Sequence, residues 1–439
     1  METLLTIVAG SLLLVSLGLL AHTYLIYPLL MACLSRGRKL PEERYVEDSE
    51  FPEVAVLMAA YNEEAVLEST LTSIFGSDYP MERVTVWIGS DGSTDCSHEI
   101  IERFAADFSN LTLEIFEGRN GKIRIINSLA RKAKERFSDP ATAVFVICDA
   151  NIIWETSALR RMVAHLKRVE VGLVGCSVVD ASRQHEGIGD QEETYVGLEN
   201  RLKYAEGVLW GNMIGAFGAC YSMNASLFTP VPESYIVDDF FQTFSVLEKG
   251  CAAIVEIEAV CYEAVSTDIE EEFRRKQRIA RGNFQNLEHF RSFLLPWNGG
   301  WSTSFAFWSH KGLRWNGPGL FIGAFISSAV LAVFHPIGLV PLFGMIASFA
   351  VAGIDWLQAR SGAKSHFKPF RFLRYLYAMN GALFLGWLAY LKGSSNSVWE
   401  PTKRVGELFR ASAHAMPPRE EKTKKRDQKS AAGEEASPR

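Results

Sequence analysis

Four short polar patches, in a fixed order along the chain, contain residues that could bind a nucleotide, hold a metal ion and move a proton. They are residues 60–64 (Ala-Tyr-Asn-Glu-Glu), 91–95 (Asp-Gly-Ser-Thr-Asp), 149–151 (Asp-Ala-Asn) and the pair Asp238-Asp239. Each of the first three follows an apolar run typical of a buried strand, at residues 54–58, 84–88 and 143–147. Because ligands bind at the carboxyl ends of parallel strands in open α/β sheets, we expect these patches to converge. Three acidic clusters at one edge indicate a nucleotide and a metal ion, and the fourth indicates a base.

The composition excludes some classes of protein and bounds the number of domains. With 439 residues the chain has room for one large domain or for two to three domains of roughly 150 residues each. Its net charge of -6 argues against a nucleic-acid partner, which usually requires a basic domain. The seven cysteines form no Cys-x-x-Cys pair, which favours reduced structural thiols over a disulfide or zinc framework.

Long charge-free stretches predict membrane spans at both ends of the chain. No Asp, Glu, Lys or Arg occurs from residue 3 to 35, and about 20 apolar residues suffice to cross a bilayer. A second charge-free stretch covers residues 315–354, and His335-Pro336 near its middle predicts a hairpin of two spans. A third and shorter stretch covers residues 375–391, and the sequence leaves open whether it crosses.

Basic residues beside these stretches predict the orientation of the protein. Arg36, Arg38, Lys39 and Arg44 follow the first span, and a second basic cluster lies between the last two stretches. Because such residues favour the cytoplasmic side, we expect an integral protein of the cell (inner) membrane with its large domain in the cytoplasm. The basic C-terminal tail fits this scheme poorly, so its side of the membrane stays open.

The order of patterns along the chain predicts five regions. Residues 1–35 form a transmembrane helix, and residues 36–265 alternate strand-like and helical runs, as in an α/β sheet. Residues 266–316 contain an amphipathic helix and an aromatic-rich stretch, which is typical of helices at the water–lipid interface. Residues 317–392 form the C-terminal transmembrane helices, and residues 393–439 lack apolar periodicity and are expected to be disordered.

The order of the patches, over roughly residues 50–315, resembles the membrane-integrated branch of the family 2 glycosyltransferases, which are inverting enzymes with the GT-A fold. Within that branch the chain resembles bacterial exopolysaccharide and poly-N-acetylglucosamine-type synthases. The resemblance implies a GT-A domain with a mixed, mostly parallel sheet at residues 36–265. It also implies hexosyl transfer (EC 2.4) from a nucleotide-diphospho-sugar, with a UDP-sugar as the expected donor, to a lipid-linked or polysaccharide acceptor, with Mg²⁺ or Mn²⁺ as cofactor.

The resemblance assigns donor-binding roles to residues in the first three patches. It implies that the loop at the end of the first strand frames the nucleotide base, with Ala60, Tyr61, Asn62 and Glu63. It implies that Asp91 contacts the base or ribose, and that Lys122, after a Gly-rich turn suited to phosphate, contacts the diphosphate. Asp149 and Asn151 stand at the Asp-x-Asp position and are the expected metal ligands, since divalent ions at phosphates prefer hard oxygen donors.

The same resemblance assigns the acceptor side of the site. Gly218, in the small-residue loop 211–220, is expected to line the sugar and acceptor site, where glycine allows close backbone approach. Asp239 is expected to act as general base on the acceptor hydroxyl, with Asp238 as the paired carboxylate that raises its pKa. Each patch also has an ordinary structural interpretation, as a helix cap, an Asx turn or a solvated turn.

Arg278 bears on whether the product is a polymer. It matches the Arg of the Gln-x-x-Arg-Trp motif of processive synthases, where it is expected to hold the diphosphate. Arg275 replaces the Gln and Ile279 replaces the Trp, which would stack on a growing polymer. A processive polysaccharide synthase and a catalytically silent nucleotide-sugar sensor are therefore kept as alternatives.

Residues 309–315 are expected to be an interfacial anchor.

Overall fold

The computed structural model describes residues 1–42, 45, 47–180, 189–263, 269–361 and 367–393. The predicted disorder of residues 393–439 concerns a segment that lies, apart from Gly393, outside the described residues.

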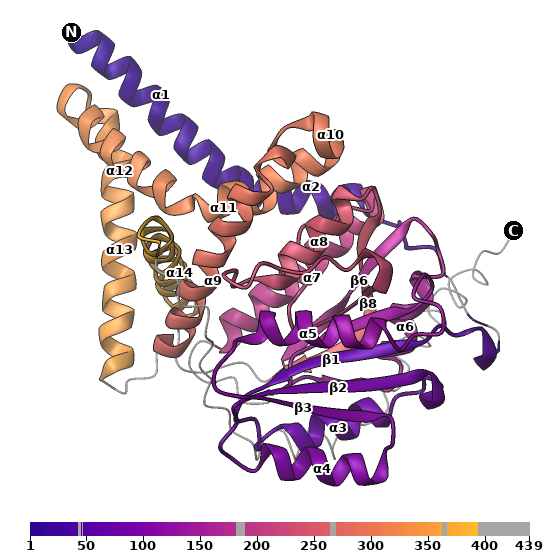
Figure 1. Cartoon of the computed structure of the whole chain (residues 1–439). Helices are drawn as coiled ribbons and strands as arrows, with labels where there is room; N and C mark the ends of the chain where they lie inside the picture. The colour runs from indigo at the N-terminus through magenta and orange to yellow at the C-terminus, as the bar shows by residue number, and fades with distance from the viewer. Residues whose placement is uncertain (43–44, 46, 181–188, 264–268, 362–366, 394–439) are drawn as a thin grey trace, which may run out of the picture.

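A mixed sheet forms the centre of the large domain (Figure 1). Within the described residues it has eight strands in the order β3-β2-β1-β4-β7-β6-β8-β5. Strands β3, β2, β1 and β4 are parallel to one another, and β7 runs antiparallel to both of its neighbours, β4 and β6. The predicted α/β fold with a mostly parallel sheet is therefore confirmed. The strand bounds are β1 (Val54–Ala60), β2 (Val84–Asp91), β3 (Leu111–Phe116), β4 (Val144–Cys148), β5 (Ile153–Trp154), β6 (Val171–Asp180), β7 (Cys220–Asn224) and β8 (Ala252–Glu263).

Helices cover both faces of this sheet, and the pattern of β1 explains why. All seven residues of β1 are buried, and alternate side chains enter two separate hydrophobic cores. A strand that is apolar at every position requires cover on both sides. One core is closed by α3 (Leu67–Phe75), α4 (Ser97–Asp107) and α6 (Ala158–His165), and the other by α5 (Lys122–Lys134) and α8 (Asp238–Glu248).

Two helices differ from their sequence patterns at one end. The sequence predicts a helix over residues 64–74, but α3 begins only at Leu67, because the chain first makes a turn in which Val66 N–H donates to the Glu63 carbonyl. The charged amphipathic pattern over residues 270–293 predicts one helix, but α9 (Ile269–His289) ends earlier and is followed by a separate 3₁₀ turn at Arg291–Leu294.

A further layer of helices connects the domain to the apolar helices. It contains α7 (Gly189–Trp210), α9, α10 (Pro296–Ala306) and α11 (Leu313–Trp315), and it shares one hydrophobic core with α2 (Tyr27–Leu34) and α8. Aromatic side chains dominate this core, and Phe244 of α8 packs against Phe307 with ring centroids 4.6 Å apart.

Among the described residues, three helical segments are long and apolar enough to cross a membrane: residues 2–34, 317–334 and 336–360. The first comprises α1 (Glu2–Ala21), a π-helical turn (His22–Ile26) and α2, and the others correspond to α12 (Gly317–Phe334) and to a 3₁₀ turn with α13 (Leu339–Arg360). The predicted hairpin at His335-Pro336 is confirmed, and the His335 ring accepts a hydrogen bond from Ile337 N–H. The last helix, α14 (Lys368–Leu391), packs against α9 and α13 and does not meet the same criteria.

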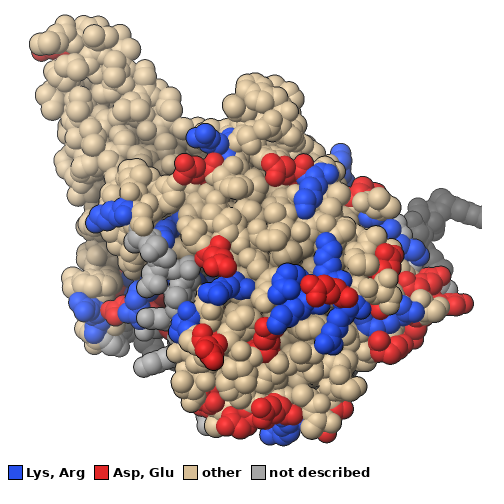
Figure 2. Space-filling view, viewed as in Figure 1, with Lys and Arg blue, Asp and Glu red and all other residues tan. Residues whose placement is uncertain are grey.

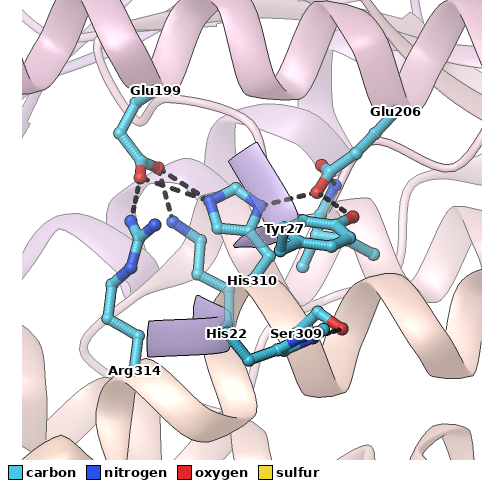
Figure 3. A network of polar contacts seen from close by, with 9 residues as sticks. His22, Tyr27, Glu199, Glu206, Ser309, His310 and Arg314 are labelled. Carbon is cyan, nitrogen blue, oxygen red and sulfur yellow. Dashed lines mark hydrogen bonds and ion pairs between the residues drawn. The ribbon is translucent and has the colours of Figure 1, made fainter. Parts of the chain in front are cut away.

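A buried polar network joins the first apolar helix to the large α/β domain (Figure 3). Both ring nitrogens of His310 face carboxylates, with Nδ1 2.8 Å from Glu206 and Nε2 3.1 Å from Glu199. Tyr27 donates its hydroxyl to Glu206 at 2.9 Å, and Lys311 and Arg314 both pair with Glu199. The network thus holds His310 between two acidic side chains of α7.

This network corrects the interpretation of residues 309–315. The sequence predicts an interfacial anchor there, but His310 has no exposed surface, and Lys311 and Arg314 are largely buried against Glu199. The physical reason is that the two glutamates of α7 lie seven residues apart on one helix face and need cationic partners once buried.

Replacing Glu206 with alanine should destabilise the whole protein. The change leaves His310, the Tyr27 hydroxyl and the Ile214 N–H without their buried acceptor, and breaking a buried pair costs about 3 kcal/mol or more. Thermal unfolding of the detergent-solubilised protein measures this as a clearly lowered midpoint. The matched control is Glu135→Ala, which removes a solvent-exposed ion pair with Arg131 and should change the midpoint little. Equal midpoints for the two variants would contradict this role for the network.

Candidate functional site

The first two patches are joined by hydrogen bonds between side chains and backbone. Asn62 adopts a left-handed conformation with φ 52°, and its side-chain oxygen accepts from Thr94 N–H at 2.8 Å. In the other direction, Asn62 N–H donates to Ser93 Oγ and Glu63 N–H donates to Ser97 Oγ. The loops that follow β1 and β2 therefore form one rigid unit at the carboxyl edge of the sheet, directly after Ala60.

Asp91 is buried and holds the loop that precedes α5. Its carboxylate accepts hydrogen bonds from the backbone N–H groups of Asn120 and Gly121 and from the Arg119 side chain. The neighbouring Gly92, with φ 72°, lies so close that an added Cβ would be 2.7 Å from the Gly118 carbonyl oxygen. The structure therefore places Asp91 beneath the Gly-rich turn.

Tyr61 lies on the other side of the same turn. The Arg119 guanidinium stacks over the Tyr61 ring, 3.3 Å from its centroid. This stacking connects the loop after β1 to the Gly-rich turn and gives Arg119 two fixed contacts, one with the ring and one with Asp91.

Lys122 lies between two carboxylates at the centre of the site. Its Nζ is 2.8 Å from Asp149 Oδ1, at the end of β4, and 3.4 Å from Asp238 Oδ2, at the start of α8. Burial alone would lower the pKa of Lys122, but the two carboxylates outweigh that effect and hold the pKa above its ordinary value. Lys122 is thus a fixed cation that brings together the third and fourth patches.

Asp149 and Asn151 differ in their accessibility. The Asp149 side chain is 37% exposed, whereas Asn151 is buried and its side-chain nitrogen has no hydrogen-bond partner in the described part of the chain. No group of three or more His, Cys, Asp or Glu residues that could hold a metal ion occurs there. The open carboxylate of Asp149 and the side-chain amide oxygen of Asn151 are the hard oxygen donors that suit a Mg²⁺ or Mn²⁺ ion that takes most of its ligands from a diphosphate and water.

Asp239 is half-buried and lies next to a close-packed glycine. Burial, and to a smaller extent the neighbouring Asp238, raise the pKa of Asp239 to about 6, against the opposing charges of Lys122 and Lys203. A Cβ added to Gly218 would lie 3.1 Å from Asp239 Oδ2, so the loop before β7 passes directly over this carboxylate. The structure therefore brings Gly218 and Asp239 together.

Arg278, from α9, reaches the same group of charges. Burial lowers its pKa, and its charge acts on both Asp149 and Asp238. The site residues predicted from the sequence therefore form two clusters. The first surrounds the central charges and contains Lys122, Asp149, Asp238, Asp239, Gly218 and Arg278. The second lies in the joined loops and contains Ala60, Tyr61, Asn62, Glu63 and Asp91.

Two residues near these charges were not predicted from the sequence. Lys203 of α7 is 3% exposed, lies 3.4 Å from the Phe217 ring centroid, and its pKa is lowered to about 7, chiefly by burial. Tyr221 of β7 is buried, and this burial is the main reason why the pKa of its hydroxyl is raised. The nearby charges of Asp238, Asp239 and Asp149 raise it further. Neither residue belongs to a local motif, so only the folded arrangement identifies them.

The amino-acid sequence matches a known family over most of the sheet and its loops. Residues 55–227, from β1 to β7, match the family model for Glycosyl transferase family 2. Over these residues the chain is similar to that family, and its α/β fold is of the GT-A type.

Curated relatives cover only part of the chain. The probable glycosyltransferase YdaM of Bacillus subtilis (strain 168) is 30% identical over 121 residues, which are 27% of this chain and 29% of that protein. The beta-monoglucosyldiacylglycerol synthase of Nostoc sp. (strain PCC 7120) is 24% identical over 257 residues, 56% of this chain and 52% of that protein. The chain thus spans about half or less of the length of the curated relatives it matches.

A solved structure extends the likeness to most of the chain. The mannosyltransferase PcManGT from Pyrobaculum calidifontis, in complex with GDP-Man and Mn²⁺, superposes with a TM-score of 0.65 and 22% identity. The superposition covers 89% of this chain and 99% of that one. At this identity the likeness shows a shared fold that includes helices outside the α/β domain.

Replacing Asp91 with asparagine should loosen the turn before α5. Asparagine retains one acceptor oxygen, but its NH₂ group would face a backbone N–H that now donates to Asp91. Limited trypsin digestion should then cut faster after Arg119, because this side chain also loses its ion pair. The control is Asp107→Asn on the exposed surface of α4. A digestion rate after Arg119 that equals the control's would contradict the anchoring role of Asp91.

Proposed function

We propose that the protein is a membrane-bound, inverting glycosyltransferase that moves a sugar from a nucleotide-diphospho-sugar, with UDP as the expected nucleotide, to a lipid-linked or glycan acceptor. The observation that carries this proposal is the placement of Asp239, a half-buried carboxylate whose pKa is raised to about 6, beside the cluster of Lys122, Asp149 and Asp238. One group of residues can hold a diphosphate, and the neighbouring carboxylate can take a proton.

The environment of Asp239 supports its role as general base. A base works best when its pKa lies near the working pH, and the raised pKa of Asp239 meets that condition. Its carboxylate faces the loop that contains Gly218, where the absence of a side chain leaves room for an acceptor hydroxyl. Removal of the hydroxyl proton would let the acceptor oxygen attack the anomeric carbon opposite the leaving diphosphate, which inverts the configuration.

The charges around Asp149 support binding of the donor diphosphate. Lys122 and Arg278 place two positive side chains beside the carboxylates of Asp149 and Asp238. Asp149 and Asn151 would hold a Mg²⁺ or Mn²⁺ ion. When bound, such an ion would stabilise the negative charge on the departing nucleotide. Lys122 would contact the phosphates through its ammonium group, which holds phosphate as a point charge.

The three apolar segments and two of the curated relatives favour a lipid as the acceptor. Those relatives are named as beta-monoglucosyldiacylglycerol synthases, which build a glycolipid. The neighbour of Arg278 is Ile279, which lacks the aromatic ring that would stack on a growing polymer. These observations favour transfer of a single sugar over processive extension of a polysaccharide.

Transfer should fall as the pH is lowered through about 6. A general base must be ionised to accept a proton, and protonation of Asp239 below its pKa removes that form, with about a tenfold loss for each further pH unit. The measurement is kcat/KM for nucleotide release by the detergent-purified protein, with membrane lipid extract as the source of acceptor. A rate that is flat from pH 5 to pH 8 would contradict the assignment.

The matched variant for this assignment is Asp239→Asn. It should lower transfer by at least about 100-fold while leaving nucleotide-sugar affinity nearly unchanged, because the amide keeps the shape but cannot accept the proton. Transfer retained at the unmodified level would exclude Asp239 as the base.

Asp149→Ala should weaken nucleotide binding only when the metal is present. The exposed carboxylate would supply a charged ligand to the ion, so its loss should reduce UDP affinity in Mn²⁺ at least about tenfold and have little effect in EDTA. Calorimetry with and without the metal measures both affinities, and Asp107→Ala serves as the control. An unchanged affinity in both conditions would remove Asp149 from the metal site.

A further inference from the structure

A charge-free, aromatic segment projects from the domain beside the first apolar helix. From Ser292 to Ser309 the sequence contains no Asp, Glu, Lys or Arg, although Arg291 and Lys311 flank it closely. This segment includes α10, which is interrupted at Gly300 with φ 76°. Its outer side is unusually exposed for apolar residues: Trp301 80%, Trp297 75%, Leu295 45%, Trp308 44% and Phe305 38%.

The exposed surface of α10 continues the apolar surface of α1 and α2. Phe305 packs against Tyr27 and His22, with ring centroids 5.6 and 6.0 Å apart. In Figure 1, α10 projects from the domain on the side from which α1 leaves it. Figure 2 shows that this projection carries no Lys, Arg, Asp or Glu on the visible face, whereas charged side chains begin just below it.

The inner side of the same segment is firmly attached to the catalytic domain. Asn212 donates its side-chain amide to Thr303 at 3.0 Å and lies in the loop that leads to Gly218. Phe307, directly after α10, packs on Phe244 of α8, the helix that begins with Asp238-Asp239. The projection is therefore held by the elements that form the acceptor side of the site.

We infer that α10 is a membrane-docking element whose outer face, with Trp297 and Trp301 at its centre, inserts into the headgroup and acyl boundary of the bilayer. The molecules that cover this outer face are lipids of one leaflet of the bilayer that α1 crosses. The inner face of α10 holds α8 at a fixed depth below that leaflet.

Three features favour lipid over a protein partner as the occupant. Tryptophan is the residue that most commonly lies at the water–lipid boundary, where its ring is buried and its N–H stays near polar groups. The patch is continuous with a helix that is long and apolar enough to span a membrane, so the same lipids would cover both. The segment offers no charged side chain with which a protein partner could be selected.

The experiment places a fluorescent label at single cysteines of the full chain in phosphatidylcholine–phosphatidylglycerol nanodiscs. The exposed Cys33 and Cys96 are first replaced by serine. Labels are then introduced through Trp301→Cys and Trp297→Cys, with Leu14→Cys as the positive control on α1 and Val169→Cys, 92% exposed on the domain, as the negative control. Quenching by lipids with a nitroxide near the headgroup is compared with quenching by iodide in water.

The expected result is lipid quenching at positions 301 and 297 at least threefold above that at position 169, together with protection from iodide. Quenching at both positions no greater than at position 169 would overturn the inference. Protection from iodide without lipid quenching would also overturn it, because a second copy or another protein would then cover the patch. Use of two labelled positions keeps the test valid if one substitution fails to yield folded protein, which the thermal midpoint reports.

This inference does not depend on the proposed sugar transfer, because the depth measurement requires no turnover. A failed transfer assay would leave the docking element intact, and a label exposed to water would leave the assignment of Asp239 intact. The two hypotheses can therefore fail separately.

Discussion

The site depends on one lysine that holds two acidic side chains together. Asp149 and Asp238 come from elements far apart in the sequence, and their carboxylates would repel each other if no cation lay between them. Lys122 can take that position because α5 begins at this residue, after a turn in which Gly121 has φ 84°. The buried Asp91, at the end of β2, fixes this turn by accepting a hydrogen bond from Gly121 N–H. Contacts thus connect the end of β2, through the turn and Lys122, to the carboxylates of Asp149 and Asp238.

A second group of buried charges, on α7, joins the site to the apolar helices. Glu199 and Glu206 face His310 and the residues around it, while Lys203, one turn away on the same helix, lies near Asp239. Buried charges of this kind contribute less to stability than apolar packing of the same volume, but they accept few alternative arrangements. We therefore interpret α7 as the element that fixes how the α/β domain sits against α2.

The sequence predicts the sheet and the hairpin at His335-Pro336 well, because each depends on a local pattern of apolar residues or Pro. It does not predict that β7 runs opposite to its neighbours, because strand direction depends on pairing between distant segments. The sequence does not place Lys203 and Tyr221 near the candidate site for the same reason, since neither lies in a motif. The error over residues 309–315 arose because the partners of His310 lie more than 100 residues away.

The reversal of β7 has a consequence for how this part of the chain could change during evolution. Because β7 enters the sheet at its carboxyl edge, where Asp149 N–H donates to the Ala219 carbonyl, the residues before it lie beside Asp149 and those after it leave on the opposite side. Length changes after Asn224 would therefore occur far from the candidate site. Length changes before Ala219 would displace Gly218 from Asp239 and reshape the space beside this carboxylate. If that space holds the acceptor, as we propose, this short loop is where a change of acceptor preference would most easily arise.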